Sequence, residues 1–310
     1  MTATECFVGI DVSKDHRDVH VRPTGTARRF ANTDAGHRQV VKFLTPLAPT
    51  LLALEATGGY ERPVVAALAV AALPVAVLNP ARVRDFARAL GRRAKTDAVL
   101  AEFAEKVRPV ARPLPDAATR HLQALIGLRR DPVGQRTDTG NRVKAATDRA
   151  VLRSLHALER VLKRELDRVE KELDAAVEAS PTWRAQAELL ESVPGIGGVL
   201  GRTLLADLPE LGTLGREEIA SLVGVAPMNQ DSGQHRGRRR VQGGRAEVRR
   251  VLYMAALSAG TCNATLRVFA DRLAAAGKAG KVVILAVARK PLVIANAVLR
   301  DHRPWQPEMA

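Results

Sequence analysis

Three short apolar runs in the first eighty residues constrain the fold most strongly. They occupy residues 7–13, 51–56 and 74–78, and stretches with helical spacing precede the second and third runs. Runs of this length, separated by helices, are typical of buried strands. The pattern predicts a mixed α/β sheet in the N-terminal part of the chain.

The first run continues into residues that alternate between polar and apolar up to position 22. This alternation predicts a hairpin of two strands that turns near residues 14–16, and a third strand is expected over 24–30. Helices are expected over 33–44 and 61–72, and over 81–107 with a break near Gly91.

The first run carries one acid, Asp11, among apolar and small residues. A buried carboxylate is costly unless a counter-charge pairs with it. No Lys or Arg precedes Asp11 in the run, so a cation from solvent is one partner for it. The alternative is an acid at a strand end that faces water.

Two further acids stand at comparable places. Glu55 closes the second apolar run, and Asp97 stands at an expected helix start. Acids that come from separate strands and a helix around one sheet can hold Mg²⁺ with its water shell. Metal ions held in this way stabilise the attacking and leaving oxygens of a phosphodiester. Asp11, Glu55 and Asp97 are therefore the predicted metal ligands.

The charge balance indicates the kind of partner. Lys and Arg number 48 against 33 Asp and Glu, so the formal net charge is +15. Such a charge favours a polyanion, and nucleic acid is a better candidate than an anionic membrane. We expect no membrane span, because no uncharged apolar run reaches the necessary length. The N-terminus lacks a signal region, so a cytoplasmic location is expected. The Ala- and Arg-rich composition fits a bacterial source, and a nucleic-acid partner would make the protein nucleoid-associated.

The two cysteines, Cys6 and Cys262, form neither a disulfide framework nor a metal-binding pattern.

The composition changes after residue 115. Residues 116–178 have helical spacing with charges of both signs, and apolar residues recur there at steps of three and four: Leu155, Leu158, Leu162, Leu166, Val169, Leu173 and Ala176. This seam predicts a helical hairpin or an intermolecular coiled coil, and an amphipathic helix packed on its own chain is the alternative. Pro132 and Gly134 are expected to break the preceding helix. The predicted domains are 1–115, 116–180 and 181–310.

A glycine-bearing turn lies within residues 193–197, of sequence Val-Pro-Gly-Ile-Gly. It has the form of a helix-hairpin-helix turn. Gly195 and Gly197 would let backbone N–H groups approach a DNA phosphate at the start of the next helix. An ordinary connection between two helices is the alternative.

A basic segment follows, with seven arginines between positions 236 and 250 and one opposing acid, Glu247. It predicts an exposed phosphate-binding loop. The residues assigned to nucleic-acid binding there are Arg236, Arg238, Arg239, Arg240 and Arg245.

Ser232 stands at the edge of this segment, between Asp231 and Gly233. A serine hydroxyl needs a base, a metal or arginines around the phosphate before it acts as a nucleophile. From the residues alone, a turn-forming Asp-Ser-Gly is the favoured interpretation. His235 is near enough in sequence to act as a base, although a solvated loop histidine is the plainer interpretation.

Taken together, these stretches resemble the DEDD-type insertion-sequence transposases, the one-ten family of insertion sequences. The matching stretches appear in the family's order and extend over nearly the whole chain: residues 7–14, 54–60, 78–80, 94–97, 193–197, 222–227, 231–233 and 236–238. The resemblance implies an N-terminal RuvC-like domain of the RNase H fold, a coiled-coil arm and a mainly helical C-terminal transposase domain.

The resemblance also implies a chemistry. In the family, four acids bind Mg²⁺, and a serine attacks DNA to form a covalent phosphoserine link. Carried over by position, Asp11, Glu55 and Asp97 are the first three acids, and Ser232 is the nucleophile. The family's members assemble as dimers or tetramers, and a noncoding bridge RNA pairs with donor and target DNA.

One position departs from the family's pattern. The family has a second acid one helical turn after Asp97, and this chain has Leu100 there. A short deletion would account for the difference, and Glu102 or Glu105 would then be the nearest substitutes. We expect a DNA transposase or recombinase. The alternatives are a nucleic-acid-binding remnant that has lost cleavage and a junction nuclease that uses water.

Overall fold

The computed structural model describes residues 5–92, 96–111, 115–229, 231–233, 237 and 239–306. The chain forms two compact units that divide between Pro115 and Asp116. The unit that follows Asp116 contains both the arm and the C-terminal helices, and the further division at 180 stays a prediction.

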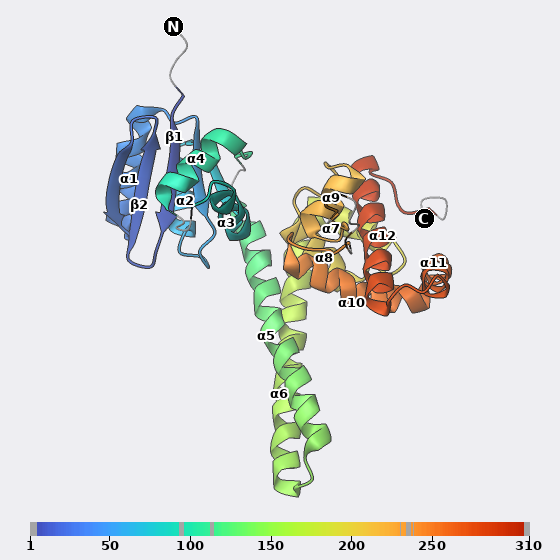
Figure 1. The fold of residues 1–310 in the computed structure, drawn as a ribbon. Coiled ribbons are helices and arrows are strands. Elements are labelled where there is room, and N and C mark those ends of the chain that lie inside the picture. The colour runs from blue at the N-terminus through green and yellow to red at the C-terminus, as the bar shows by residue number, and fades with distance from the viewer. Residues whose placement is uncertain are drawn as a thin grey trace. The chain divides into compact units, whose positions relative to one another are not determined.

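The first unit is built on one five-stranded sheet (Figure 1). Its strand order is β3-β2-β1-β4-β5, in which β1 pairs antiparallel with β2 and parallel with β4. The strands are β1 (Phe7–Val12), β2 (His16–Arg22), β3 (Thr26–Ala31), β4 (Leu51–Glu55) and β5 (Val75–Leu78). The predicted mixed α/β sheet is confirmed.

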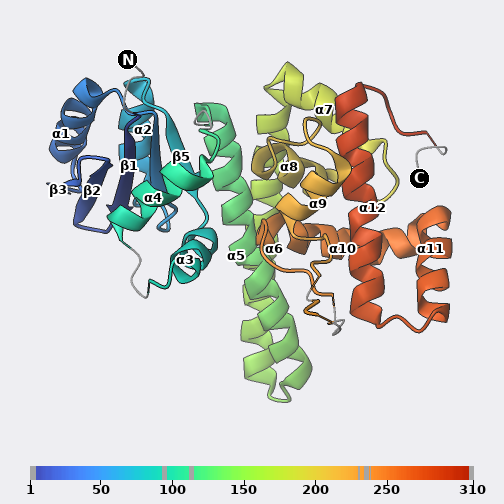
Figure 2. The same ribbon diagram turned by 45° about the horizontal axis from the view of Figure 1, so that its top comes forward.

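Helices cover both faces of this sheet (Figure 2). The side chains of α1 (Asp34–Leu44) and α2 (Arg62–Val70) pack with Val8, Ile10 and Leu54 on one face. Those of α3 (Pro80–Ala89) and α4 (Asp97–Val107) pack with Phe7 and Ala53 on the other. Successive strand residues point to opposite faces, so the central strands β1 and β4 are buried on both sides, whereas the edge strand β3 is mostly exposed. A short 3₁₀ helix, Thr45–Leu47, follows α1.

The second unit is helical. Its helices are α5 (Ala117–Ala145), α6 (Arg149–Glu178), α7 (Pro181–Glu191), α8 (Gly198–Asp207), α9 (Arg216–Val223), α10 (Ala246–Cys262), α11 (Ala264–Ala275) and α12 (Gly280–Asp301). By length and composition α12 is apolar enough to cross a membrane. Its Leu292, Ala295 and Val298 are buried in the core of the unit, which explains its apolar composition.

The expected helix break at Pro132 and Gly134 is wrong. Helix α5 runs through both residues, and Pro132 is buried within it. A proline in a helix removes one backbone hydrogen bond and usually kinks the helix. The extended packing of α5 against α6 offsets that loss, because tertiary contacts supply most of a helix's stability.

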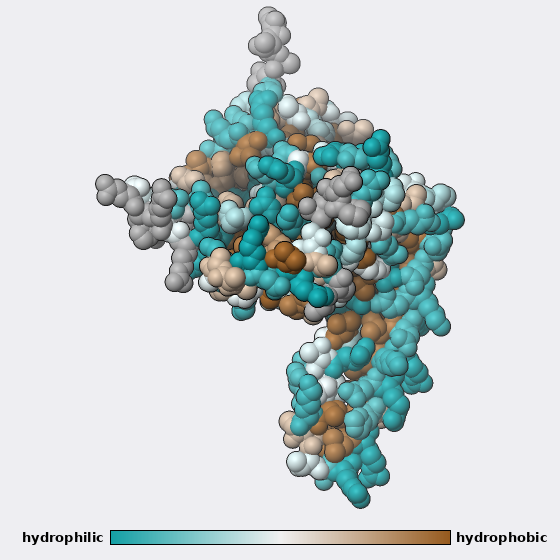
Figure 3. Space-filling model, turned by 90° about the vertical axis from the view of Figure 1, so that its right-hand side faces the viewer, coloured by the Kyte–Doolittle hydropathy of each residue, from teal (hydrophilic) through white to brown (hydrophobic). Residues whose placement is uncertain are grey.

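The apolar seam of α6 faces α5 within the same chain. Leu155, Leu162 and Leu173 are buried, whereas Leu158 is exposed. The arm is therefore a helical hairpin, the first of the two predicted arrangements, and pairing between chains stays a prediction. Figure 3 shows the arm's outer surface as mostly hydrophilic, with scattered hydrophobic side chains.

Two leucines on α6 distinguish these arrangements. Leu162 is 7% exposed and Leu158 is 39% exposed. We expect Leu162→Ala to lower the free energy of unfolding by about 2–5 kcal/mol. Leu158→Ala should change it by less than about 0.5 kcal/mol. Urea unfolding followed by circular dichroism measures both, and a concentration-dependent loss in Leu158→Ala would instead indicate pairing between chains.

Candidate active site and nucleic-acid surface

Asp11 and Glu55 lie at neighbouring positions on two parallel strands. Ile10 of β1 pairs with Leu54 of β4, so the next residue on each strand is an acid. Neighbours at the same register position project from the same face of a sheet. Here it is the face covered by α3 and α4, which we call the acid-bearing face. Asp11 is partly exposed and Glu55 is buried.

Helix α4 brings the third predicted acid to this face. Its first residue is Asp97, and the Thr96 side chain caps the helix. A Cβ atom placed on Gly9 of β1 would lie 2.0 Å from the Asp97 backbone oxygen and 2.3 Å from the Ala101 nitrogen. Only glycine permits this approach, so α4 rests directly on β1 two residues before Asp11.

Helix α4 also contacts β2, in the antiparallel half of the sheet. The Oδ1 of Asp97 accepts a hydrogen bond from the Ala98 N–H at 2.9 Å. The pKa of Arg29 on β3 is raised, first by its hydrogen bond with Asp18 and further by the charges of Asp18 and Asp97.

The predicted acids share one face but do not form a complete ligand set. Within the described ranges, no three Asp, Glu, His or Cys side chains are grouped so that they could hold a metal. Asp11 and Glu55 nevertheless suit Mg²⁺, which keeps several waters and often takes one or two carboxylates together with substrate phosphates. Asp11 and Glu55 therefore fit a metal whose other ligands come from water and a bound phosphate.

Position 100, where the family pattern has its fourth acid, is occupied by a buried leucine. Leu100 of α4 is fully buried, in the same hydrophobic cluster as Phe7 and Ala53 of the sheet. The two candidate substitutes are engaged in ion pairs: Glu102 lies 3.0 Å from Arg92, and Glu105 lies 2.7 Å from Arg22. The side chain at position 100 therefore stabilises the contact between helix and sheet.

Glu61 organises the loop that follows Glu55, and sequence analysis missed it. Its Oε2 accepts hydrogen bonds from the Thr57 N–H at 3.0 Å and the Gly59 N–H at 2.9 Å. Burial raises the pKa of Glu61, but these hydrogen bonds outweigh it, so the pKa is lowered. The sequence signal that could have identified Glu61 is an acid two residues after the Gly58-Gly59 turn.

Gly195 and Gly197 have different structural roles in this turn. Gly195 has a φ of 100°, and a Cβ there would lie 2.7 Å from the Ala259 Cβ, so packing against α10 requires glycine. Gly197 is the N-cap of α8, and among the described atoms none lies within 4 Å of a Cβ placed on it. The open start of α8 is thus the part that suits a phosphate.

Ser232 is exposed on a loop whose base is closed by a β-bridge. The Met228 N–H donates to the Arg240 carbonyl at 2.9 Å, and the Arg240 N–H donates back at 3.3 Å. Ser232, Arg239 and Arg240 are all exposed. The predicted residues His235, Arg236 and Arg238 lie outside the described residues.

Three arginines of the basic segment bind their own chain. Arg245 donates to both carboxylate oxygens of Glu210, at 2.5 and 2.7 Å, and to the Asp207 carbonyl at 2.8 Å. Arg249 donates to the Gly243 carbonyl, and Arg250 donates to Glu247 at 2.8 Å. Among the described arginines assigned to DNA, Arg239 and Arg240 are exposed. Arg245 as a DNA contact stays a prediction.

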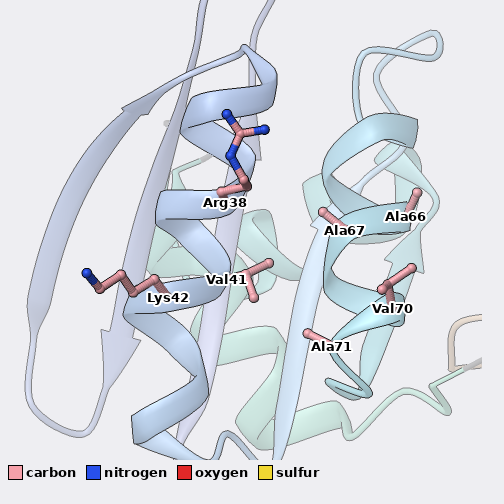
Figure 4. A pocket seen from close by; sticks show the side chains of 7 residues that line it. All are labelled: Arg38, Val41, Lys42, Ala66, Ala67, Val70 and Ala71. Atoms are coloured by element: carbon pink, nitrogen blue, oxygen red, sulfur yellow. The ribbon is translucent and has the colours of Figure 1, made fainter.

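A groove of about 500 Å³ lies between α1 and α2, on the face opposite the acids (Figure 4). Helix α1 contributes Arg38, Val41 and Lys42, and α2 contributes Ala66, Ala67, Val70 and Ala71. The groove contains none of the predicted site residues and is mainly apolar with a basic rim.

The chain is similar to known transposases. A transposase family model of the DEDD type matches residues 8–152, and a model of the IS116/IS110/IS902 transposase family matches residues 187–271. The pilin gene-inverting protein of Moraxella bovis is 26% identical over 97% of this chain and 98% of its own length.

Two further likenesses cover less of the chain. An uncharacterised 42 kDa protein of insertion element IS900 from Mycobacterium paratuberculosis is 32% identical over 43% of this chain and 34% of its own length. The structure of T. thermophilus RuvC in complex with a Holliday junction substrate aligns with 36% of this chain and 100% of RuvC, at 17% identity and a TM-score of 0.26.

The family matches and the long alignment define a DNA-recombining enzyme of the transposase class. The chain belongs to the IS110/IS116/IS902 family of transposases.

The contact of α4 with β1 is testable at Gly9. We expect Gly9→Ala to lower the free energy of unfolding by about 1–3 kcal/mol, because the added methyl group meets backbone atoms. Gly127→Ala is the matched control, because a Cβ there meets no described atom within 4 Å. Thermal unfolding measures both variants, and an unchanged Gly9→Ala would contradict the close contact.

The lowered pKa of Glu61 gives a second expectation. A carboxyl whose folded pKa lies below its ordinary value of 4.5 stabilises the fold above that value. The stabilisation is lost as pH falls through the folded pKa. Glu61→Gln should therefore lower the free energy of unfolding by about 1–3 kcal/mol at pH 7, and by progressively less below pH 4.5. Urea unfolding of both proteins across this pH range measures the effect. A difference between wild type and Glu61→Gln that does not change with pH would contradict the prediction.

Proposed function

We propose that the chain cuts and rejoins DNA by transesterification, with Asp11 and Glu55 as metal ligands and Ser232 as the nucleophile. The observation that carries the proposal is the placement of Asp11 and Glu55 side by side at the ends of adjacent parallel strands. Helix α4 adds Asp97 above the same face, and we propose Asp97 as the third ligand.

Mg²⁺ bound at these acids would stabilise charge on the phosphodiester oxygens during strand cleavage. The chain's own contribution is to orient the carboxylates. The parallel pairing of β1 with β4 sets the spacing of Asp11 and Glu55, and the loop held by Glu61 supports the end of β4.

In the proposed reaction the Ser232 hydroxyl oxygen bonds to the phosphorus, and the bond from phosphorus to one deoxyribose oxygen breaks. The serine proton leaves to solvent or a base, and the released DNA hydroxyl takes up a proton. A DNA hydroxyl later attacks the phosphoserine and restores the serine. Arg239 and Arg240, exposed on the same loop, would neutralise the developing charge.

The proposed partners are the DNA of the element's ends and target, a noncoding bridge RNA, and further copies of the chain in a dimer or tetramer. The net charge of +15 supports a nucleic-acid partner. The likeness to proteins named for gene inversion and for insertion elements supports a recombination substrate. A cytoplasmic, nucleoid-associated location follows from such a substrate.

A second candidate function rests on Leu100. Its burial closes the position of the fourth acid, and Glu102 and Glu105 are paired with arginines. A chain that binds DNA without cleaving it would have the same surface and fold. We propose this remnant as the alternative to the active enzyme.

One experiment separates these functions. The protein is incubated with Mg²⁺, the noncoding RNA of the element, target DNA and labelled DNA that carries the element's ends, and covalent adducts are detected on a denaturing gel. We expect an adduct with the wild-type chain and with Ser221→Ala, an exposed serine on α9. Ser232→Ala should give none, because it lacks the attacking oxygen.

Each other outcome has a distinct meaning. An adduct that persists in Ser232→Ala excludes this serine. Cleaved ends without linked protein would indicate a nuclease that uses water. Bound but intact DNA with the wild-type chain would indicate the remnant.

A further inference from the structure

The row of charged residues on the acid-bearing face continues to the edge of the sheet. Asp11 of β1 pairs with Asp18 of β2, and Asp18 pairs with Arg29 of β3. Directly paired residues project from the same face. Arg29 therefore stands on the same face as the proposed metal ligands, on the edge strand.

Arg29 is held at this edge by a bidentate ion pair. Its Nε donates to Asp18 Oδ1 at 2.6 Å and its Nη2 donates to Asp18 Oδ2 at 3.0 Å. Hydrogen bonds in the described part of the chain thus use two of the five guanidinium N–H groups, which leaves three for a ligand. The side chain is 66% exposed, so solvent and ligands can reach it.

DNA that approaches Asp11, Glu55 and Asp97 meets like charge. Arg29 presents N–H donors on the same face, two strands from Asp11, and its planar guanidinium matches two oxygens of one phosphate. Asp18 holds the guanidinium over the acid-bearing face while its remaining donors stay available.

We infer that Arg29 binds a backbone phosphate of the nucleic acid strand that enters the acid-bearing face, and that Asp18 is its positioning residue. The inference rests on the proposed function, because it concerns the substrate of the same acids. A purely structural cross-strand ion pair is the competing explanation.

Arg28 provides a matched control. It is the neighbouring residue on β3 and therefore points to the opposite face, where its guanidinium lies 4.6 Å from the centre of the Phe43 ring. Arg28→Ala and Arg29→Ala remove the same charge from the same strand. A general electrostatic effect would be equal in both variants, whereas a phosphate contact would appear only in Arg29→Ala.

The test is fluorescence anisotropy of the full chain with a labelled 30-bp duplex, in EDTA, over a series of salt concentrations. We expect Arg29→Ala to reduce the slope of log K against log salt by about 0.9, equivalent to about eightfold weaker binding at 0.1 M salt. Arg28→Ala should leave both quantities unchanged. Equal losses in the two variants, or no loss in Arg29→Ala, would overturn the inference.

Two conservative variants separate positioning from charge. Arg29→Lys should retain the wild-type slope but bind more weakly, because lysine keeps the charge and cannot donate two parallel hydrogen bonds to one phosphate. Asp18→Asn should likewise retain the slope and weaken binding. Tighter binding by Asp18→Asn would show that Asp18 competes with the phosphate, which would overturn its positioning role. Thermal unfolding of each variant verifies that the fold is kept.

These measurements are independent of the chemistry proposed for Ser232. The difference between the Arg29 and Arg28 variants should persist in a Ser232→Ala background, in which no adduct forms. If the adduct experiment fails and this difference remains, Arg29 is a DNA-binding residue of a chain that does not cleave. If the difference is absent and the adduct forms, only the inference about Arg29 fails.

Discussion

The close approach of α4 to β1 at Gly9 is the contact on which the acid-bearing face depends. Two backbones meet there with no side chain between them, so the first turn of α4 lies within reach of the strand that carries Asp11. The same contact buries Leu100 against the sheet. One packing constraint therefore brings the start of α4, with Asp97, onto the acid-bearing face and also buries the side chain at position 100.

Charge serves two purposes in this chain, and exposure distinguishes them. Arg245 and Arg249 satisfy carboxylates and carbonyls of their own unit, which holds the start of α10 in place. Arg239 and Arg240 are exposed on the loop that carries Ser232, and Arg29 is exposed on the acid-bearing face, two strands from Asp11. Exposed guanidinium groups near the proposed reacting residues are the ones available to phosphates, whatever the total charge.

Much of the first unit was predictable because its signals are local. Short apolar runs ended by turn residues predicted the strands, and the helix expected over 33–44 is observed as α1. Pro132 was misjudged because the backbone preference of one residue is small beside the packing of a long helix against its partner. Glu61 was missed because its hydrogen bonds to the loop depend on how the turn folds.

The sequence by itself determined the strands, the acids at their ends, the positive charge and the family. These follow from residue type and order, because each residue carries its own hydrophobicity, charge and turn preference. Only the tertiary structure decided the row that joins Glu55, Asp11, Asp18 and Arg29, since strand register is a property of pairing between distant segments. It also decided that Arg245 is an internal anchor, because burial and partners arise only when helices pack.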